Sequence, residues 1–440
     1  MKKIALISLG CPKNQVDSEI MLGLFSARGY ELTNDLSEAE WIIVNTCGFI
    51  ESAKEESIEA ILDAAEYKKI GSCKKLAVTG CLSQRYREEI LEELPEIDVV
   101  TGTADYHNIV ALLEEDVREQ FGDINCSPDY SELPRVNSMP FYTGYLKIAD
   151  GCDNHCTYCI IPSIRGTYRS RPMEELISEA EELVKSGVRE LILVAQDTTA
   201  YGKDLYGAPK LAELMKGLCD IPDLHWIRFH YGYPEGITDE LLQVIAENKK
   251  ICQYFDLPIQ HCNNRVLKRM GRPCTKEELK ALFEKIRNLM PDATLRTTVI
   301  VGFPGETEEE YEELCEFAGE VGFDRMGVFS YSAEEGTPAA RLPEQIEDDV
   351  KEQRRENLML CQSRISEANN QRKLGLSLEV LTEGFDEERC LYFGRTAADS
   401  VEIDGTVYFG SMEEIPVGTF VTVEIEDADE YDLYGRTCEE

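Results

Sequence analysis

"YLKIADGCDNHCTYC", residues 145–159, carries a short apolar run straight into three cysteines spaced four and three residues apart. The apolar run predicts a β-strand, and the polar, glycine-led segment after it lacks the periodicity of a packed face. Barrels built from alternating strands and helices place their functional groups at the carboxyl ends of the strands. The cysteines stand at such an end, so this stretch predicts both a parallel α/β barrel and the position of its site.

Three interpretations of this cysteine cluster deserve comparison. Free cysteines are often core residues, and zinc could take His155 as a fourth ligand, although His155 and the adjacent Cys156 would then have to turn toward one ion. The third interpretation is an iron–sulfur cluster, which cysteine thiolates hold. We favour it because a cubane cluster with three protein ligands keeps one iron open to a substrate, which explains the missing fourth cysteine.

Strands and helices alternate around this cluster. Six β-rich runs are separated by amphipathic helices such as "PMEELISEAEELVKSG", which predicts six βα units and a parallel sheet curled into an incomplete barrel. In "VGFPGET", at the end of the fifth run, Gly302 and Gly305 either approach a cofactor or form a plain βα turn. The six runs are residues 142–152, 188–199, 224–234, 252–262, 293–306 and 324–337.

A second set of cysteines lies near the N-terminus. The apolar runs "KKIALISLGC", "EWIIVNTC" and "KKLAVTGC" each end in a cysteine, giving Cys11, Cys47 and Cys81 at steps of 36 and 34 residues. A step of that size is one βα unit, so the three should meet at one edge of a parallel sheet, where such sheets bind ligands. We expect a second three-cysteine metal site, with buried structural thiols as the alternative. Cys73 and Cys126, off this pattern, are interpreted as structural.

Composition limits the compartment and the partners. The 440 residues suffice for roughly two to four domains, no run of about 18 apolar residues could span a membrane, and the N-terminal apolar run is too short for a signal peptide. We expect a cytoplasmic protein, in which sixteen cysteines indicate metal binding or catalysis rather than disulfides. The formal net charge of −39 disfavours direct binding of nucleic acid and favours a basic protein partner.

The CxxxCxxC motif, with an aromatic residue before its last cysteine, resembles the signature of the radical S-adenosylmethionine (SAM) enzymes. The resemblance implies a 4Fe–4S cluster whose open iron binds the amino and carboxylate groups of SAM, and whose electron cleaves SAM to a 5'-deoxyadenosyl radical. It also implies an electron donor such as flavodoxin or ferredoxin. The cofactor residues that it implies are Cys152, Cys156, Cys159, Tyr158, Gly302 and Gly305.

Two three-cysteine sets, one on a small α/β domain and one on a barrel, resemble the methylthiotransferase family over nearly the whole chain. The resemblance implies a second 4Fe–4S cluster, on Cys11, Cys47 and Cys81. It implies an N-terminal flavodoxin-like α/β domain, a central partial (β/α)6 radical-SAM barrel and a C-terminal small β-barrel, the OB-like TRAM domain, whose strands include "LSLEVLTEG" and "LYFGRT". The predicted divisions are residues 1–126, a linker at 127–139, the radical SAM core at 140–371 and the TRAM domain at 372–440.

Within that family, "LGCPKNQVDSE" resembles the branch that modifies a protein rather than transfer RNA. "AYGKDLYG" and "LPIQHCNNRVLKRMGR" agree, although Cys262 stands where a small residue is expected. This branch modifies the β-carbon of an aspartate in small-subunit ribosomal protein twelve, free or on the ribosome. The C–H bond there is too weakly acidic for acid–base chemistry, so a radical is required. The resemblance implies that the SAM-derived radical removes the hydrogen, that the N-terminal cluster delivers the methylsulfur group, and that a second SAM supplies the methyl; no catalytic residue beyond the cluster ligands is predicted.

The charge of the C-terminal segment bears on the substrate independently of the resemblance. Residues 373–440 hold 18 acidic and 4 basic residues, a net charge of −14, whereas an OB-like barrel that binds RNA needs a positive groove. An acidic domain suits a basic ribosomal protein, because complementary charge speeds the encounter; a solvated surface without a partner is the alternative. Residues 421–437 are expected to form one strand with several carboxylates on one exposed face.

Two other functions remain open. A transfer-RNA adenosine methylthiotransferase would share most of these motifs, and a basic C-terminal segment would have favoured it. A non-catalytic metal-binding scaffold that docks on ribosomes is the second. Cleavage of SAM by the reduced, reconstituted protein would exclude the scaffold.

Overall fold

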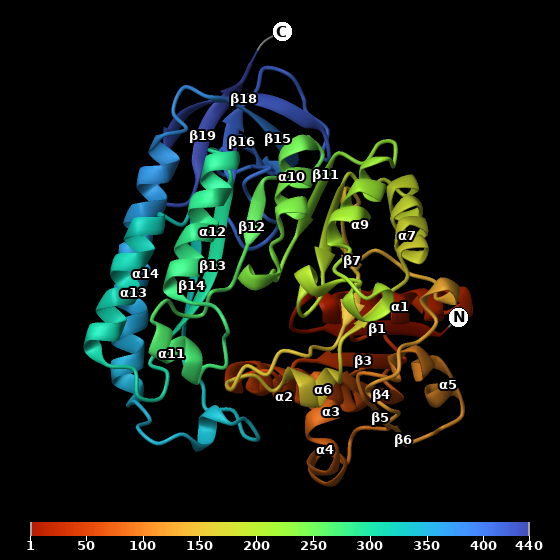
Figure 1. Cartoon of the computed structure of the whole chain (residues 1–440). Coiled ribbons are helices and arrows are strands. Elements are labelled where there is room, and N and C mark those ends of the chain that lie inside the picture. Colours follow the sequence, from red (N-terminus) through yellow and green to blue (C-terminus); the bar gives the residue numbers. More distant parts are fainter. Residues whose placement is uncertain (1, 439–440) are drawn as a thin grey trace.

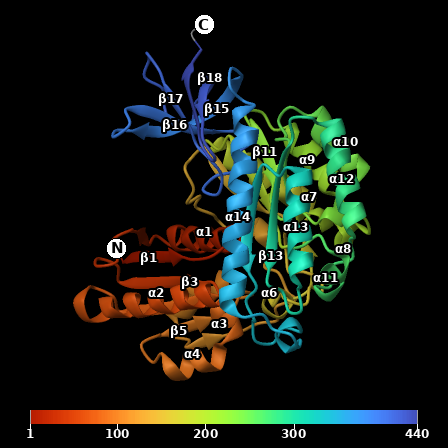
Figure 2. The same ribbon diagram turned by 90° about the vertical axis from the view of Figure 1, so that its left-hand side faces the viewer.

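The computed structural model describes residues 2–438 and shows a chain in three parts (Figure 1). A central barrel of strands and helices separates an N-terminal α/β unit from a small C-terminal β-barrel, and the turned view in Figure 2 keeps these two at opposite ends of the molecule. Among the described residues, no helix is long and apolar enough to cross a membrane. Residues 439–440 of the predicted TRAM domain lie outside the described residues.

The N-terminal unit is one parallel sheet of six strands in the order β2-β1-β3-β4-β5-β6. This is the 2-1-3-4-5 order of flavodoxin-like folds with one strand added, which confirms the predicted fold. Every residue of β3 is buried, as expected of a parallel strand covered on both faces. The strands are β1 Lys3–Ser8, β2 Glu31–Leu32, β3 Trp41–Thr46, β4 Lys75–Gly80, β5 Val99–Thr101 and β6 Glu119–Gln120, and the helices are α1 Pro12–Ala27, α2 Glu51–Ile70, α3 Cys81–Arg85, α4 Arg87–Glu93 and α5 Ile109–Glu114, with short 3-10 turns at Tyr106–Asn108 and Tyr130–Glu132.

Six parallel strands form the central barrel, at the six positions that the sequence predicts. They make two three-stranded sheets, β7-β10-β11 and β12-β13-β14, joined by a parallel bridge between Ile227 and Ile251. Within residues 2–438, no pairing closes β14 onto β7, so the barrel is incomplete, as predicted. The strands are β7 Thr143–Lys147, β10 Glu190–Val194, β11 Trp226–Phe229, β12 Tyr254–Asp256, β13 Thr294–Val301 and β14 Arg325–Ser330, and β8 Ala149–Asp150 pairs separately with β9 Arg169–Ser170.

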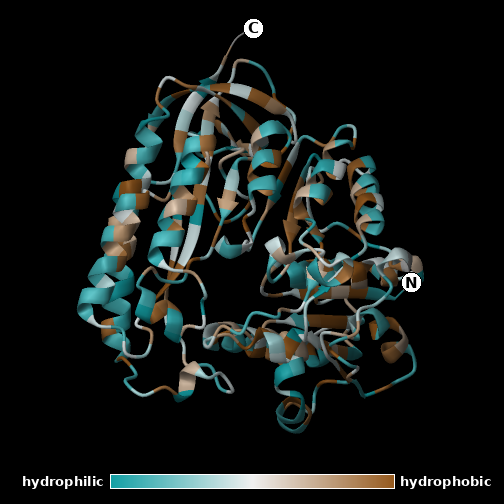
Figure 3. Ribbon diagram, viewed as in Figure 1, coloured by the Kyte–Doolittle hydropathy of each residue, from teal (hydrophilic) through white to brown (hydrophobic). Residues whose placement is uncertain are grey.

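Amphipathic helices cover the outside of this barrel. Capping boxes at Thr275 and Thr307 begin α12 and α13 by satisfying backbone N–H groups of the first turn. Figure 3 shows apolar residues gathered on the strands and polar residues on the outward faces of α13 and α14. The helices are α6 Ile161–Arg165, α7 Met173–Lys185, α8 Lys203–Tyr206, α9 Leu211–Cys219, α10 Asp239–Glu247, α11 Asn264–Arg269, α12 Lys276–Leu289, α13 Glu308–Val321 and α14 Asp348–Gln371, with 3-10 turns at Thr198–Ala200, Pro234–Gly236 and Ala339–Arg341.

The C-terminal segment forms a closed barrel in the order β15-β16-β17-β19-β18, which confirms the predicted small β-barrel. The expected single strand at 421–437 is wrong. Asp429 and Asp432 turn the chain there, because the backbone N–H groups of Tyr431 and Asp432 donate to the Asp429 carboxylate and the Thr406 N–H donates to Asp432. The strands are β15 Ser377–Asp386, β16 Leu391–Thr396, β17 Val407–Gly410, β18 Phe420–Ala428 and β19 Leu433–Thr437.

One loop of the small barrel enters the central barrel. Residues 397–404, between β16 and β17, are here called the lumen loop. Asp399 pairs with Arg325 at 2.8 Å, and Ser400 Oγ lies 2.8 Å from His230 Nε2. Val401 belongs to the same apolar cluster as Tyr145 of β7. These partners belong to β7, β14 and the residue that follows β11, so the lumen loop packs inside the barrel against strands of both three-stranded sheets.

Candidate functional site

The barrel cysteines lie in a tight loop after β7 and β8. Cys152 and Cys156 are buried and Cys159 is half-buried. Gly151, immediately before them, has a φ of +76°, and a Cβ there would lie 2.0 Å from the Thr167 carbonyl oxygen. Only glycine fits both the backbone conformation and the close approach. The three thiols are therefore displayed by a loop that is pressed against its neighbouring segment.

Few charged groups stabilise the ionised form of these buried thiols. Burial raises the pKa of Cys152 to about 11 and that of Cys159 to about 12. The Cys156 sulfur lies 3.1 Å from the Tyr233 hydroxyl, and the Arg272 guanidinium stands over the Tyr233 ring at 4.0 Å. Metal ions bind thiolates and release the thiol protons. The raised pKa values of Cys152 and Cys159 thus suit this loop to a metal cluster that supplies the missing positive charge.

The N-terminal cysteines stand at one edge of the parallel sheet, as predicted. Cys11 follows β1, Cys47 follows β3, and Cys81 follows β4, three adjacent strands whose pairing aligns their carboxyl ends. The β1/β3 boundary is where the strand order reverses, the usual ligand position of such sheets. A Cβ at Gly10 would lie 2.9 Å from the Cys47 Cβ, and one at Gly48 would lie 2.8 Å from a backbone atom of the Cys81 loop. Glycines beside the cysteines therefore let the three loops converge.

Buried amides fix the backbone around this second set. The Asn14 side-chain amide donates to the Thr46 carbonyl at 2.9 Å, and the Asn45 amide donates to the Asn14 carbonyl at 2.8 Å. The Ser57 hydroxyl accepts from the Cys47 N–H at 3.0 Å and donates to the Cys47 carbonyl at 2.9 Å. The loops of Cys11 and Cys47 are thus held by side-chain hydrogen bonds that do not use the sulfurs.

The two sets share a positive environment. Desolvation opposes ionisation of Cys11, but Lys13 and Arg165 together lower its pKa. Burial raises the pKa of Cys81, with Arg165 acting against that rise. Lys13 also acts on Cys159 of the barrel, and its ammonium group stands 3.4 Å above the centre of the Tyr231 ring. A buried cation is therefore within electrostatic reach of both cysteine sets.

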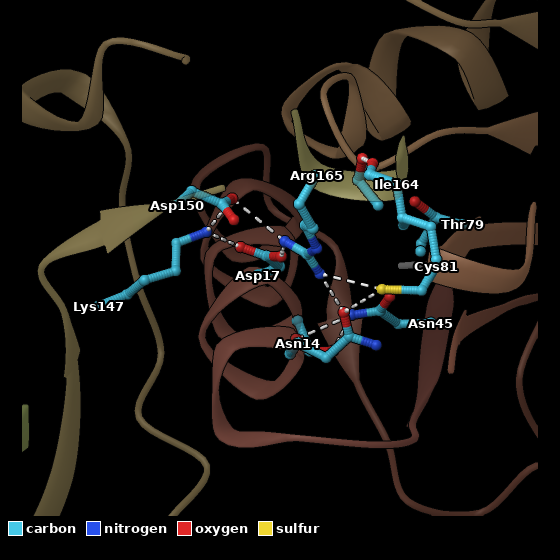
Figure 4. A network of polar contacts seen from close by, with 12 residues as sticks. Asn14, Asp17, Asn45, Thr79, Cys81, Lys147, Asp150, Ile164 and Arg165 are labelled. Atoms are coloured by element: carbon cyan, nitrogen blue, oxygen red, sulfur yellow. Dashed lines mark hydrogen bonds and ion pairs between the residues drawn. The ribbon is translucent and has the colours of Figure 1, made fainter. Parts of the chain in front are cut away.

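A network of buried charges joins the two cysteine-bearing parts (Figure 4). Lys147 pairs with Asp17 and, at 3.4 Å, with Asp150. Arg165 pairs with Asp17 at 2.8 Å and with Asp150 at 3.2 Å, and its other amino group reaches the Cys81 sulfur at 3.6 Å. Two cations and two anions balance, as buried charges must. The barrel's cysteine loop and the N-terminal sheet thus meet at one polar core.

The other predicted cofactor residues surround the barrel loop less directly. Tyr158 packs on the apolar cluster that contains Phe303, in the loop of Gly302 and Gly305. Both glycines have positive φ, +72° and +76°, and a Cβ at Gly302 would lie 2.3 Å from the Lys351 side chain. The two glycines are therefore required by the turn itself. Of Tyr158, Gly302 and Gly305, it is Tyr158 that lies in the cysteine loop.

The other histidine and cysteine residues considered as metal ligands do not belong to either cysteine set. His155 is exposed, whereas the adjacent Cys156 is buried. Cys262 is fully buried and its sulfur lies 3.6 Å from the Glu313 carbonyl, so it fills core space. Cys73 is buried and Cys126 is exposed. Across residues 2–438, no three His, Cys, Asp or Glu side chains stand close enough together to hold a single metal ion.

Sequence patterns did not reveal the charged network. Asp17 lies near the end of the quoted motif "LGCPKNQVDSE", and Arg165 lies six residues beyond Cys159, where the quoted cysteine motif ends. Their contact joins residues 148 positions apart. An Asp and an Arg near cysteines suggest a pair only once the fold is known, so no signal within either motif could have found it.

Family comparisons match all three parts of the chain. Residues 3–102 match uncharacterized protein family UPF0004, residues 146–318 the radical SAM superfamily, and residues 374–438 the TRAM domain. The chain is 54% identical to a ribosomal protein uS12 methylthiotransferase RimO of Clostridioides difficile (strain 630), over 99% of this chain and 98% of the relative. The chain belongs to the RimO family. The same-named protein of Desulforamulus reducens is 51% identical over 100% of both chains, and that of Geobacter sulfurreducens is 49% identical over 99% of this chain and 98% of the relative.

Solved structures agree with the fold of this RimO family member. The radical SAM methyltransferase TsrM of Kitasatospora setae, with cobalamin and a [4Fe-4S] cluster bound, superposes with a TM-score of 0.56 at 13% identity, covering 77% of each chain. At that identity the likeness concerns the fold. Membership of the radical SAM superfamily brings a 4Fe–4S cluster and SAM as cofactors.

Proposed function

We propose that this chain adds a methylthio group to the β-carbon of an aspartate of ribosomal protein uS12, using two 4Fe–4S clusters and SAM. Cys152, Cys156 and Cys159 would hold the cluster that binds SAM, and a second cluster would be held by Cys11, Cys47 and Cys81. The observation that carries the proposal is the contact between Arg165, from the barrel's cysteine loop, and Cys81 of the other set. This contact between the two parts supports the proposal that the two cysteine sets serve one reaction.

The residues present fit these groups. Each set offers three thiols and no fourth protein ligand, the donor number that leaves one iron open. Cys152 and Cys156 of the barrel set are buried in one loop, and glycines let the three loops of the N-terminal set approach one another. When bound, the clusters and SAM supply the radical and sulfur chemistry that an unactivated C–H bond requires.

Side chains of the protein itself would position the cysteine ligands and orient the substrate. The Tyr233 hydroxyl is positioned to donate to the Cys156 sulfur, and Arg272 fixes the Tyr233 ring. Lys13 offers a buried cation that acts on Cys11 and Cys159. A substrate carboxylate entering between the two sets would pair with that ammonium group, which would orient an aspartate side chain there.

The substrate must also be recruited. The small barrel exposes Glu413, Glu414, Glu426, Asp427 and Glu430, and a basic protein is the complementary partner. These carboxylates would repel transfer RNA. A flavodoxin or ferredoxin in the cytoplasm would supply the electron.

The test of this function is mass spectrometry of two substrates under one set of conditions. The reconstituted, reduced chain is incubated with SAM and either isolated uS12 or bulk transfer RNA. We expect a methylthio mass increase on one aspartate-containing peptide of uS12 and none on transfer-RNA nucleosides. Methylthioadenosine in the RNA would establish the alternative enzyme, and binding to ribosomes without SAM cleavage would establish the non-catalytic scaffold.

A further inference from the structure

We propose that Arg165 is a positioning residue for the N-terminal cysteine set: carried by the barrel, it fixes Cys81 and makes a cluster there easier to reduce. The inference rests on the proposed function, because it assumes that Cys11, Cys47 and Cys81 hold a cluster. Arg165 belongs to α6, six residues after Cys159, so one short segment of chain carries a ligand of one set and a contact to the other.

The two amino groups of the Arg165 guanidinium contact different partners. One amino group pairs with Asp17 at 2.8 Å and with Asp150 at 3.2 Å. The other donates to the Asn14 side-chain oxygen and reaches the Cys81 sulfur at 3.6 Å. Figure 4 shows these two ends pointing to opposite sides of the network. A planar fork with five N–H groups can do this, whereas a lysine ammonium is a single point of charge.

Burial makes the contact consequential. Arg165 is 2% exposed, so little water screens its charge from the sulfur. Hydrogen bonds and net charge around the cysteine sulfurs set the reduction potential of an iron–sulfur cluster. A fixed cation at the Cys81 sulfur stabilises the reduced, more negative cluster. Its removal should therefore move the potential to a more negative value.

A purely structural role must be separated from this one. Arg85 is a matched control, since it also joins the N-terminal unit to the barrel. It donates to the Gly48 carbonyl at 2.9 Å and to the Glu334 carboxylate at 2.9 Å, with no contact to a sulfur. Both arginines should contribute to stability, but only Arg165 should affect the cluster.

The experiment uses the full chain with Cys152, Cys156 and Cys159 replaced by Ala, so that one cluster remains. In that background we compare Arg165→Lys, the charge-balanced double variant Arg165→Gln with Asp17→Asn, and Arg85→Gln. Iron per chain, the thermal unfolding temperature and the midpoint potential from an EPR-monitored redox titration are measured. The double variant keeps the network neutral, with Lys147 opposite Asp150, which protects the fold.

We expect both Arg165 variants to retain the fold and to show a more negative potential or a loss of iron, while Arg85→Gln lowers the unfolding temperature and leaves the potential unchanged. Arg165→Lys should behave like the double variant, because the two carboxylates draw the ammonium away from Cys81. Unchanged potentials and iron in both Arg165 variants, or an equal shift in Arg85→Gln, would overturn the inference. Absence of iron from the background chain would instead refute the proposed two-cluster function, and this inference with it.

Discussion

At the scale of single residues, glycines decide how closely the cysteine loops approach. Gly151 combines a positive φ with a position against the Thr167 carbonyl, and Gly10 lies directly beside Cys47. Gly207 has nearly the same φ as Gly151, +77°, but nothing lies within 4 Å of a Cβ built there. Gly151 and Gly207 thus both adopt a positive φ, but a side chain at Gly151 would meet the backbone whereas one at Gly207 would meet open space.

The first prediction uses this difference. Gly207→Ala should cost only the left-handed conformation, about 1–2 kcal/mol. Gly151→Ala should cost more, because its Cβ would displace the backbone that supports Cys152, and about half of the iron should be lost with the barrel cluster. Thermal unfolding and iron analysis of both variants make the comparison. Equal effects in the two would show that the Gly151 contact does not hold the cysteine loop.

The second prediction concerns the barrel cysteines. Replacing Cys152, Cys156 and Cys159 with Ala should leave about half of the iron and sulfide and abolish SAM cleavage, because the N-terminal set lies on a different sheet with its own supporting hydrogen bonds. Iron and sulfide analysis with an assay of 5'-deoxyadenosine measures both. Complete loss of iron, or zinc in its place, would contradict two independent clusters.

The third prediction is the reciprocal one. With Cys11, Cys47 and Cys81 replaced by Ala, the reduced chain should still form 5'-deoxyadenosine, whereas methylthiolation of uS12 should stop because the sulfur-carrying cluster is absent. Mass spectrometry of the substrate and chromatography of the cofactor products distinguish the two steps. Methylthiolated product from this variant would assign the N-terminal cysteines a structural role.

At the scale of elements, strands and their cysteines could be predicted, and turns and long-range pairs could not. An apolar run ending in a cysteine marks where a strand ends, so both cysteine sets were located from local pattern. "EDADEYD", residues 426–432, stands between two strand-like runs, and only the hydrogen bonds to Asp429 and Asp432 reveal that the chain turns there. Lys147 meets Asp17 across 130 residues, a contact that no local pattern contains. The proposed cluster ligands and domain divisions stay predictions.

The fourth prediction concerns the acidic surface of the small barrel. Asp429 and Asp432 hold the β18–β19 turn, and Glu424 and Glu426 pair with Arg436 at 3.3 Å and 3.2 Å. The carboxylates to neutralise are therefore the exposed Glu413, Glu414, Asp427 and Glu430. Their conversion to amides should slow the capture of uS12, most at low salt, since attraction between exposed charges is screened beyond about 8 Å at physiological ionic strength. SAM cleavage without substrate should not change.

The matched control neutralises four exposed carboxylates of α4, Glu88, Glu89, Glu92 and Glu93, which changes the net charge equally. Binding kinetics of isolated uS12 across a salt series compare the two variants. If both reduced the association rate alike, overall charge would be responsible. An unchanged affinity and rate in the small-barrel variant would place recognition elsewhere on the chain.

At the scale of the whole molecule, a buried carboxylate joins the small barrel to the central barrel in addition to the contacts of the lumen loop. Glu190, fully buried at the start of β10, accepts from Arg228 at 2.7 Å and from Arg395 at 2.7 Å. Burial opposes its ionisation, but Arg395 and Arg228 lower the pKa of Glu190 to about 2. The stabilisation is therefore complete above the ordinary pKa of 4.5 and is lost as the pH falls toward 2.

The fifth prediction is that Glu190→Gln destabilises the chain by about 3–5 kcal/mol, because it leaves the buried Arg228 without a carboxylate and leaves the buried Arg395 with Glu383 alone. The variant should also lack this part of the acid sensitivity. Glu379→Gln is the control, since Glu379 is exposed and pairs with a half-buried His225 across the same interface, and pairs near the surface contribute little. Thermal unfolding and proteolysis of the segment between α14 and β15, followed from neutral pH downward, report the effect. Equal stability of the two variants would contradict it.

The lumen loop also has a consequence for synthesis of the protein. A ribosome completes the six strands of the central barrel, residues 143–330, well before it adds residues 397–404. Until then Arg325 lacks Asp399 and His230 lacks Ser400, so these inward-facing groups remain hydrated and the barrel interior stays unfinished. Domains usually fold one after another as the chain emerges. In this chain we expect the central barrel to complete its packing only after the small barrel has been synthesised. A nascent chain that ends before Ala397 has a central barrel whose interior lacks the lumen loop.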